Sequence, residues 1–193
     1  MSHQLNFIYN DSDWVAPSEY PDLRDATEVA IDLETKDPEL KRLGSGWATG
    51  KGHVVGFAVA ALGKQWYFPI AHDLLKRPST KIFHNASYDV GWLIANGFEI
   101  NGKIVDTMIA AALIDENRWS FSLNACAKDY LGEIKNETFL KEKAKEWGID
   151  PKADLWKMPA GYVGFYAEQD ADLTLKLWQR FKSEIQQQSI NDV

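Results

Sequence analysis

The sequence predicts an α/β domain built on a mixed β-sheet with flanking helices. Short apolar runs of strand length occupy the first half, two of them are joined by a glycine turn, and later runs alternate with helical patterns. A chain of 193 residues with 45% hydrophobic content suits one domain with a proper core. We therefore expect a single domain over residues 1–193, with its core from about 29 to 180 and an irregular lead-in over 1–24.

The first half is expected to consist mainly of strands. A short strand is expected within the lead-in, at Leu5–Tyr9, and Val29–Leu33 is an apolar run of strand length. A polar, glycine-bearing stretch, Lys36–Gly52, follows. His53–Leu62 and Gln65–Ile70 then read as an antiparallel hairpin around a tight Gly63-Lys64 turn.

The second half alternates strands and helices. Short strands are expected at Lys81–His84 and Ile104–Val105. Helices are expected where apolar residues recur at helical spacing, namely over Ser87–Asn96, Asp106–Ile114, Ser122–Tyr130 and Gly161–Phe181. The charged segment Glu133–Lys152 is poor in β-branched residues and is predicted to be a mobile helical loop.

Composition limits the classes of function. A net charge of -7 argues against a protein that grips duplex nucleic acid through a broad basic face. The single Cys126 rules out a disulfide framework, and no apolar stretch approaches the roughly 20 residues that span a bilayer. We expect a soluble protein in a reducing, intracellular compartment, without a membrane partner.

Four carboxylates and one phenol stand beside apolar runs that would bury them. Asp32 and Glu34 share one face of a strand, because strand side chains alternate, and Asp89 falls in the first turn of a helix. Tyr166 and Asp170 are four residues apart, so they share one face of a helix. Buried carboxylates are costly unless they share a cation, so the pattern indicates a hard-metal site for phosphate chemistry.

Three motifs carry a family resemblance. Asp32-Leu33-Glu34, Asn85 through Asp89 and Tyr166 through Asp170 resemble the three motifs of the DEDDy 3′-5′ exonucleases, which have an RNase H-like fold. Over Val29–Arg180 the chain most resembles the proofreading exonuclease domain of family A DNA polymerases, the DNA polymerase I type. The resemblance implies a hydrolase that releases nucleoside 5′-monophosphates from single-stranded or frayed DNA 3′ ends.

The resemblance also implies a cofactor and a role for each motif residue. Two divalent cations, Mg²⁺ or Mn²⁺, would be bridged by Asp32, with Glu34 and Asp170 on the side of the nucleophile. Asp89 would help to hold the second ion. Tyr166 would orient the attacking water, since a phenol with an ordinary pKa near 10 is a poor base at neutral pH.

Four further positions resemble substrate contacts of the family. Asn85 and Tyr88 correspond to residues that touch the 3′-terminal nucleotide and its backbone, and Leu33 and Thr35 to residues that line its sugar and base. For Asn85, capping of the helix near Ser87 is an alternative role.

Several neighbouring residues are expected to be structural instead. Trp119 and Phe121 are expected to pack rather than stack on a frayed base, His84 to serve the structure rather than a zinc site, and Asp106 to cap the following helix.

One region departs from the DNA polymerase I type. The stretch Asp37–Gly52 is longer than the corresponding turn and resembles versions in phage-encoded family A polymerases. The expected setting is therefore the cytoplasm of a bacterial cell or a phage-infected host. Because polymerase motifs are absent, the chain is either the N-terminal part of a larger DNA polymerase or a stand-alone exonuclease.

Partners and rival functions follow from the same comparison. The expected partners are a single-stranded DNA 3′ end and a polymerase domain in the same or another chain. The rivals are a ribonuclease D-like 3′-5′ exoribonuclease and a catalytically silent scaffold that binds DNA or a partner protein.

Overall fold

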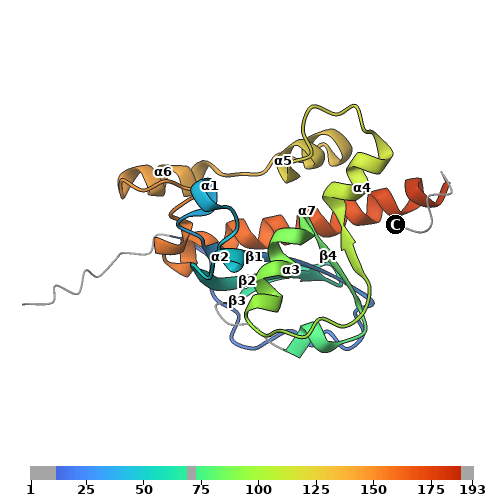
Figure 1. The fold of residues 1–193 in the computed structure, drawn as a ribbon, viewed down its shortest axis with the longest axis horizontal. Helices are drawn as coiled ribbons and strands as arrows, with labels where there is room; N and C mark the ends of the chain where they lie inside the picture. Colours follow the sequence, from blue (N-terminus) through green and yellow to red (C-terminus); the bar gives the residue numbers. More distant parts are fainter. Residues whose placement is uncertain (1–11, 69–72, 188–193) are drawn as a thin grey trace, which may run out of the picture.

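A five-stranded mixed sheet forms the centre of the computed structural model, which describes residues 12–68 and 73–187 (Figure 1). The strands lie in the order β3 (Lys64–Phe68), β2 (His53–Ala61), β1 (Glu28–Lys36), β4 (Thr80–Phe83) and β5 (Ile104–Asp106). β2 pairs antiparallel with both β1 and β3, whereas β4 pairs parallel with β1 and β5. The predicted mixed sheet is confirmed.

Helices cover both faces of this sheet. The long helix α7 (Ala160–Gln187) crosses one face, and α3 (Ala86–Ala95) lies on the other (Figure 1). The remaining helical segments are α1 (Leu40–Leu43), α2 (Gly46–Thr49), the 3₁₀ turn η1 (Asp73–Lys76), α4 (Thr107–Ile114), α5 (Leu123–Cys126), the π-helical turn η2 (Ala127–Leu131), α6 (Thr138–Glu146) and the 3₁₀ turn η3 (Leu155–Lys157). Within the described ranges, no helix is long and apolar enough to cross a membrane.

Alternation along β1 divides the core into two layers. Ala30 faces α7, whereas Val29, Ile31 and Leu33 pack on the side of α3. Residues 32, 34 and 36 continue the row that Ala30 begins, because side chains on a strand repeat every second residue. The sheet therefore directs the side chains of Asp32 and Glu34 toward α7.

The predicted hairpin is confirmed, but its turn lies one residue earlier than predicted. Leu62 and Gly63 both have positive φ, 54° and 72°, as a two-residue turn of the I′ kind requires. Lys64 is already the first residue of β3. Residues 69–70 of the predicted second strand, and the predicted strand at Leu5–Tyr9, lie outside the described residues.

Two polar or charged segments contain helices, the first of them expected only as a glycine-bearing stretch and the second as a helical loop. The stretch 37–52 forms α1 and α2, and Trp47 of α2 packs against Gly91 of α3, where a Cβ would overlap the indole ring. The charged segment 133–152 contains helix α6, and its residues 133–137 run along α7. The first segment therefore lies against α3, whereas the second lies against α7, the helix toward which Asp32 and Glu34 point.

Candidate active site

Strand β1 supplies the first two carboxylates. Beside them β2 has an irregularity: Glu34 pairs with Gly56 and Thr35 with Val54, so Val55 is an extra residue. The phenol of Tyr67, on β3, lies directly against Gly56, where any side chain would overlap it. Burial and the charges of Glu34 and Asp32 raise the pKa of Tyr67, so this phenol borders the carboxylate pair.

Helix α3 adds Asp89, which lies in its first turn as predicted and is buried. One Asp89 carboxylate oxygen accepts a hydrogen bond of 3.2 Å from the backbone N–H of Leu33. That bond joins α3 to the middle of the Asp32-Leu33-Glu34 segment. Asp106 fixes the start of the helix by accepting from the backbone N–H groups of Asn85 and Ala86, at 3.0 and 2.8 Å.

Helix α7 supplies Tyr166 and Asp170 from one face. Asp170 is buried, and the charges of Asp170, Glu34 and Asp32 all act with burial to raise the pKa of Tyr166 above its ordinary value. Glu168, between them in sequence, accepts from the Trp14 indole and from the backbone N–H of Tyr67, both at 3.0 Å. These bonds hold this part of α7 against the edge of the sheet.

The electrostatics of the cluster show an excess of negative charge. Burial, with the charge of Asp170, raises the pKa of Asp32 to about 8, and burial raises the pKa of Asp170 to about 6. Burial and neighbouring carboxylates also raise the pKa values of Glu34 and Asp89. Burial is the main cause of this pattern, and repulsion between neighbouring carboxylates adds to it at Asp32, Glu34 and Asp89. The structure thus brings the four predicted carboxylates and Tyr166 together.

Lys135 is a member of this cluster that sequence reasoning missed. Its ammonium forms an ion pair with Asp170 and lies 3.5 Å from the centroid of the Tyr166 ring, and only 5% of its side chain is exposed. It opposes the upward pKa shifts of Asp32, Glu34 and Asp170. No sequence signal separates it from the other lysines of the segment 133–152.

The donor set fits a hard divalent cation. All the side-chain donors are oxygens, and one buried oxygen of Asp170 has no hydrogen-bond partner. Across residues 12–68 and 73–187, however, no three acidic, histidine or cysteine side chains already surround a common ion position. The ammonium of Lys135 forms an ion pair with Asp170 at this position.

The predicted substrate-contact residues lie on the α3 side of the sheet: Leu33 and Thr35 are two residues apart on β1, and Asn85 and Tyr88 lie at the start of α3. Leu33 is buried in the core on the side of α3. The hydroxyls of Thr35 and Tyr88 lie 2.8 Å apart, and the Tyr88 hydroxyl also donates to Asp37, at 3.0 Å. Asp37, which anchors the N–H of Gly46 as well, was not recognised from the sequence.

The side chain of Asn85 does not cap helix α3, which was the alternative role predicted for it. Asn85 precedes α3 with a positive φ of 72°, but its side chain makes no capping bond to the helix. The side-chain amide oxygen of Asn85 instead accepts from the hydroxyl of Ser87, at 3.1 Å. Side-chain capping by Asn85 is therefore wrong, and the side chain that binds this helix start is Asp106, which accepts from the N–H groups of Asn85 and Ala86.

The other neighbouring residues divide between correct and incorrect predictions. His84 is structural, since its ring nitrogens lie 2.8 Å from the Thr107 hydroxyl and from the Phe121 carbonyl. Asp106 caps α4 by accepting from the N–H of Met108. Phe121 packs against the cluster around α4 and α5, but Trp119 is fully exposed, so its predicted packing is wrong.

Comparisons with known proteins identify the family of this chain. A family model for family A DNA polymerases, described as 3′-5′ exonuclease, matches residues 20–186. The chain belongs to this 3′-5′ exonuclease family. The exonuclease is 36% identical over 207 residues to a DNA-directed DNA polymerase of Pseudomonas phage M6, covering 95% of this chain and 31% of that protein. It is 30% identical to DNA polymerase DpoZ of Salmonella phage PMBT28, covering 90% of this chain and 29% of that protein.

The exonuclease therefore spans about a third of the length of these curated relatives. Solved structures support the fold. Brucella melitensis NrnC with bound Mg²⁺ has a TM-score of 0.63 at 19% identity, covering 89% of this chain and 81% of that one. The catalytic core of RRP6 from Trypanosoma brucei, mutant C496S, has a TM-score of 0.59 at 21% identity, covering 86% and 44%. The expected RNase H-like α/β fold is confirmed. The family match also confirms the predicted enzyme class, a nuclease that acts as a hydrolase.

Proposed function

We propose that this exonuclease proofreads DNA synthesis by hydrolysing the terminal phosphodiester of a single-stranded or frayed DNA 3′ end, releasing nucleoside 5′-monophosphates. The observation that carries the proposal is the convergence of Asp32, Glu34, Asp89 and Asp170 from β1, α3 and α7, with Tyr166 beside them. The curated relatives are DNA polymerases three times as long, which supports a polymerase domain as the partner. In this proposal residues 1–193 belong to the exonuclease domain of such a polymerase.

The four carboxylates would hold two divalent cations, Mg²⁺ or Mn²⁺. Bound there, such ions would stabilise charge on the phosphodiester and lower the pKa of an attacking water. The excess negative charge of the cluster supports this assignment. Asp32 would contact both ions, Glu34 and Asp170 would serve the side of the nucleophile, and Asp89 would serve the second ion.

Tyr166 would orient the attacking water rather than accept its proton. Burial and the neighbouring carboxylates raise its pKa above the ordinary value, so the phenol stays protonated at neutral pH and can donate a hydrogen bond. Its position four residues before Asp170 on α7 supports this role, because the two side chains share one helix face and Asp170 is a proposed metal ligand.

The 3′ end would be held beside β1 and the start of α3. Thr35 and Tyr88 present paired hydroxyls there, Asn85 presents an amide at the helix start, and Leu33 backs the strand from the core. A cavity of about 520 Å³ lies next to Tyr166 and offers an approach for a single strand. Phe139 and Phe165 line it, and aromatic side chains suit unpaired bases.

The test is digestion of matched 5′-labelled single-stranded DNA and RNA with Mg²⁺, Mn²⁺ or EDTA. The wild type should shorten DNA from its 3′ end in either metal, and Asp32→Ala should lose this activity by orders of magnitude. Asp172→Ala is the matched control, because Asp172 lies on α7 and pairs with Lys176 instead. Preference for RNA would favour a ribonuclease D-like enzyme, and inactivity with every metal would favour the silent scaffold.

A further inference from the structure

Lys135 is held inside the carboxylate cluster by several contacts at once. Its ammonium pairs with Asp170, lies over the Tyr166 ring and stands 3.9 Å from a carboxylate oxygen of Glu137. The side chains of Lys135, Asp170 and Glu137 are 5%, 9% and 12% exposed. An ion pair on an exposed surface contributes little to stability, but the pair between Lys135 and Asp170 is largely removed from solvent.

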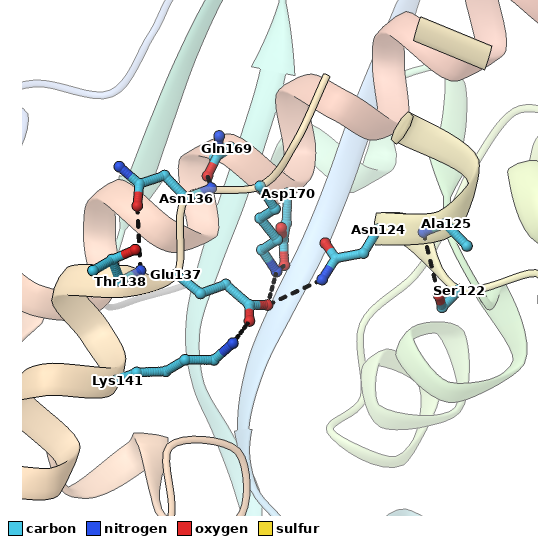
Figure 2. Close-up of polar contacts among 10 residues, drawn as sticks. Ser122, Asn124, Ala125, Asn136, Glu137, Thr138, Lys141, Gln169 and Asp170 are labelled. Carbon is cyan, nitrogen blue, oxygen red and sulfur yellow. Dashed lines mark hydrogen bonds and ion pairs between the residues drawn. The ribbon is translucent and has the colours of Figure 1, made fainter. Parts of the chain in front are cut away.

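The segment that carries Lys135 is anchored along its length. The backbone N–H of Asn136 donates to Gln169 on α7, at 3.1 Å, and Glu137 accepts from Asn124 and pairs with Lys141 (Figure 2). Before it, Glu133 pairs with Lys176 of α7, at 2.9 Å. We call residues 133–137 the α7 strap. These bonds, made by the residues on both sides of Lys135, set its ammonium against Asp170.

A cation and an ammonium cannot use the same carboxylate oxygens at once. Asp170 offers one oxygen to Lys135, while its other oxygen is buried and unpartnered. A divalent ion bound by the Asp170 carboxylate would also bring its positive charge close to the ammonium of Lys135. Like charges at this separation repel strongly where water is largely excluded.

We propose that Lys135 is a built-in counter-ion that occupies the Asp170 side of the metal site and must withdraw when a divalent cation binds. The inference rests on the proposed metal site. Lys135 is thus a positioning residue that acts through Asp170: it keeps the metal-free cluster folded and makes the site demand a higher concentration of metal. If the pair is formed in nine of ten metal-free molecules, the apparent dissociation constant rises about tenfold.

The experiment is a Mn²⁺ titration of the protein without nucleic acid, followed by electron paramagnetic resonance of the free ion. Lys135→Met removes the charge and keeps the length of the side chain, and we expect it to bind the first Mn²⁺ about tenfold more tightly. Lys135→Arg keeps a cation and should bind as the wild type does. Lys141→Met is the matched control, because Lys141 pairs with Glu137 at 2.6 Å, is 58% exposed and makes no ion pair with Asp170.

Thermal unfolding gives a second reading on the same samples. In EDTA, Lys135→Met should melt at a lower temperature than the wild type, and saturating Mn²⁺ should raise its melting temperature by more. Lys135→Gln, which keeps a polar group for Asp170, replaces the methionine variant if that variant does not fold. A purely structural lysine would lower the melting temperature without tightening the binding of Mn²⁺.

Equal or weaker Mn²⁺ binding by the folded Lys135→Met protein, with normal binding by the wild type, would overturn the inference and leave the proposed metal site standing. Absence of Mn²⁺ binding in the wild type and in every variant would overturn both. Tighter binding by Lys135→Met and Lys141→Met alike would also overturn it, since general electrostatics would then account for the effect.

Discussion

Replacing Asp32 with asparagine should stabilise the metal-free protein, and more so at pH 8 than at pH 5. Burial and the charge of Asp170 raise the pKa of Asp32 from 3.8 to about 8, so the folded chain holds this proton more tightly than the unfolded chain does. As the pH rises from 4 to 8, the unfolded state ionises first and the free energy of unfolding falls. Asparagine has no proton to lose and removes this dependence.

The expected size follows from the shift. One pKa unit corresponds to about 1.4 kcal/mol, and the interval from pH 5 to pH 8 covers most of the shift at Asp32. Because neighbouring groups share the proton equilibrium, we expect Asp32→Asn to gain about 2 to 4 kcal/mol relative to wild type over this interval. For a domain of this size that is about 5 to 15 °C in melting temperature.

The assay is thermal unfolding by circular dichroism in EDTA from pH 5 to pH 8, for the wild type, Asp32→Asn and Asp25→Asn. Asp25 is an exposed carboxylate, so its variant should follow the wild type. If the wild type and Asp32→Asn lose stability in parallel as the pH rises, the raised pKa of Asp32 in the folded protein is refuted.

Three further changes test other parts of the structure. Tyr166→Phe should lower single-turnover cleavage by about tenfold, the worth of one oriented hydrogen bond, and by less than Asp170→Ala; equal losses would mean that the phenol does more than orient water. Asp106→Ala removes the acceptor for three backbone N–H groups at two helix starts and should cost about 2 to 3 kcal/mol in urea unfolding. Gly91→Ala should cost about 1 to 3 kcal/mol and change tryptophan fluorescence, because the methyl group displaces Trp47; an unchanged spectrum would show that α2 does not depend on this contact.

The parts of the fold that were predictable from sequence depend on local signals. The apolar run at Val29–Leu33 specifies β1, and the two-residue alternation places Asp32 and Glu34 together on one face. The four-residue spacing of Tyr166 and Asp170 does the same on α7. Such patterns can be recognised because the residues that define them are close neighbours in the chain.

The parts that were missed depend on contacts between distant segments. Lys135 joins the cluster only because the α7 strap is anchored by Gln169 and Lys176, and nothing near it in sequence indicates this. The phenol of Tyr67 reaches the Glu34 side of β1 because Gly56 has no side chain. Leu62 adopts a positive φ at the hairpin, which its residue type disfavours, so the turn was placed one residue too late.

The order of elements along the chain has a consequence for folding. Strand β1 comes first and α7 comes last, yet α7 packs across β1, β2, β3 and β4 (Figure 1). Such contacts between remote segments close a long loop and form slowly compared with local helices. During synthesis the sheet and α3 emerge from the ribosome before Tyr166 and Asp170 do. The nascent chain therefore completes the carboxylate cluster only when α7 docks on the sheet, and under the proposed function it would not degrade nucleic acid before that step.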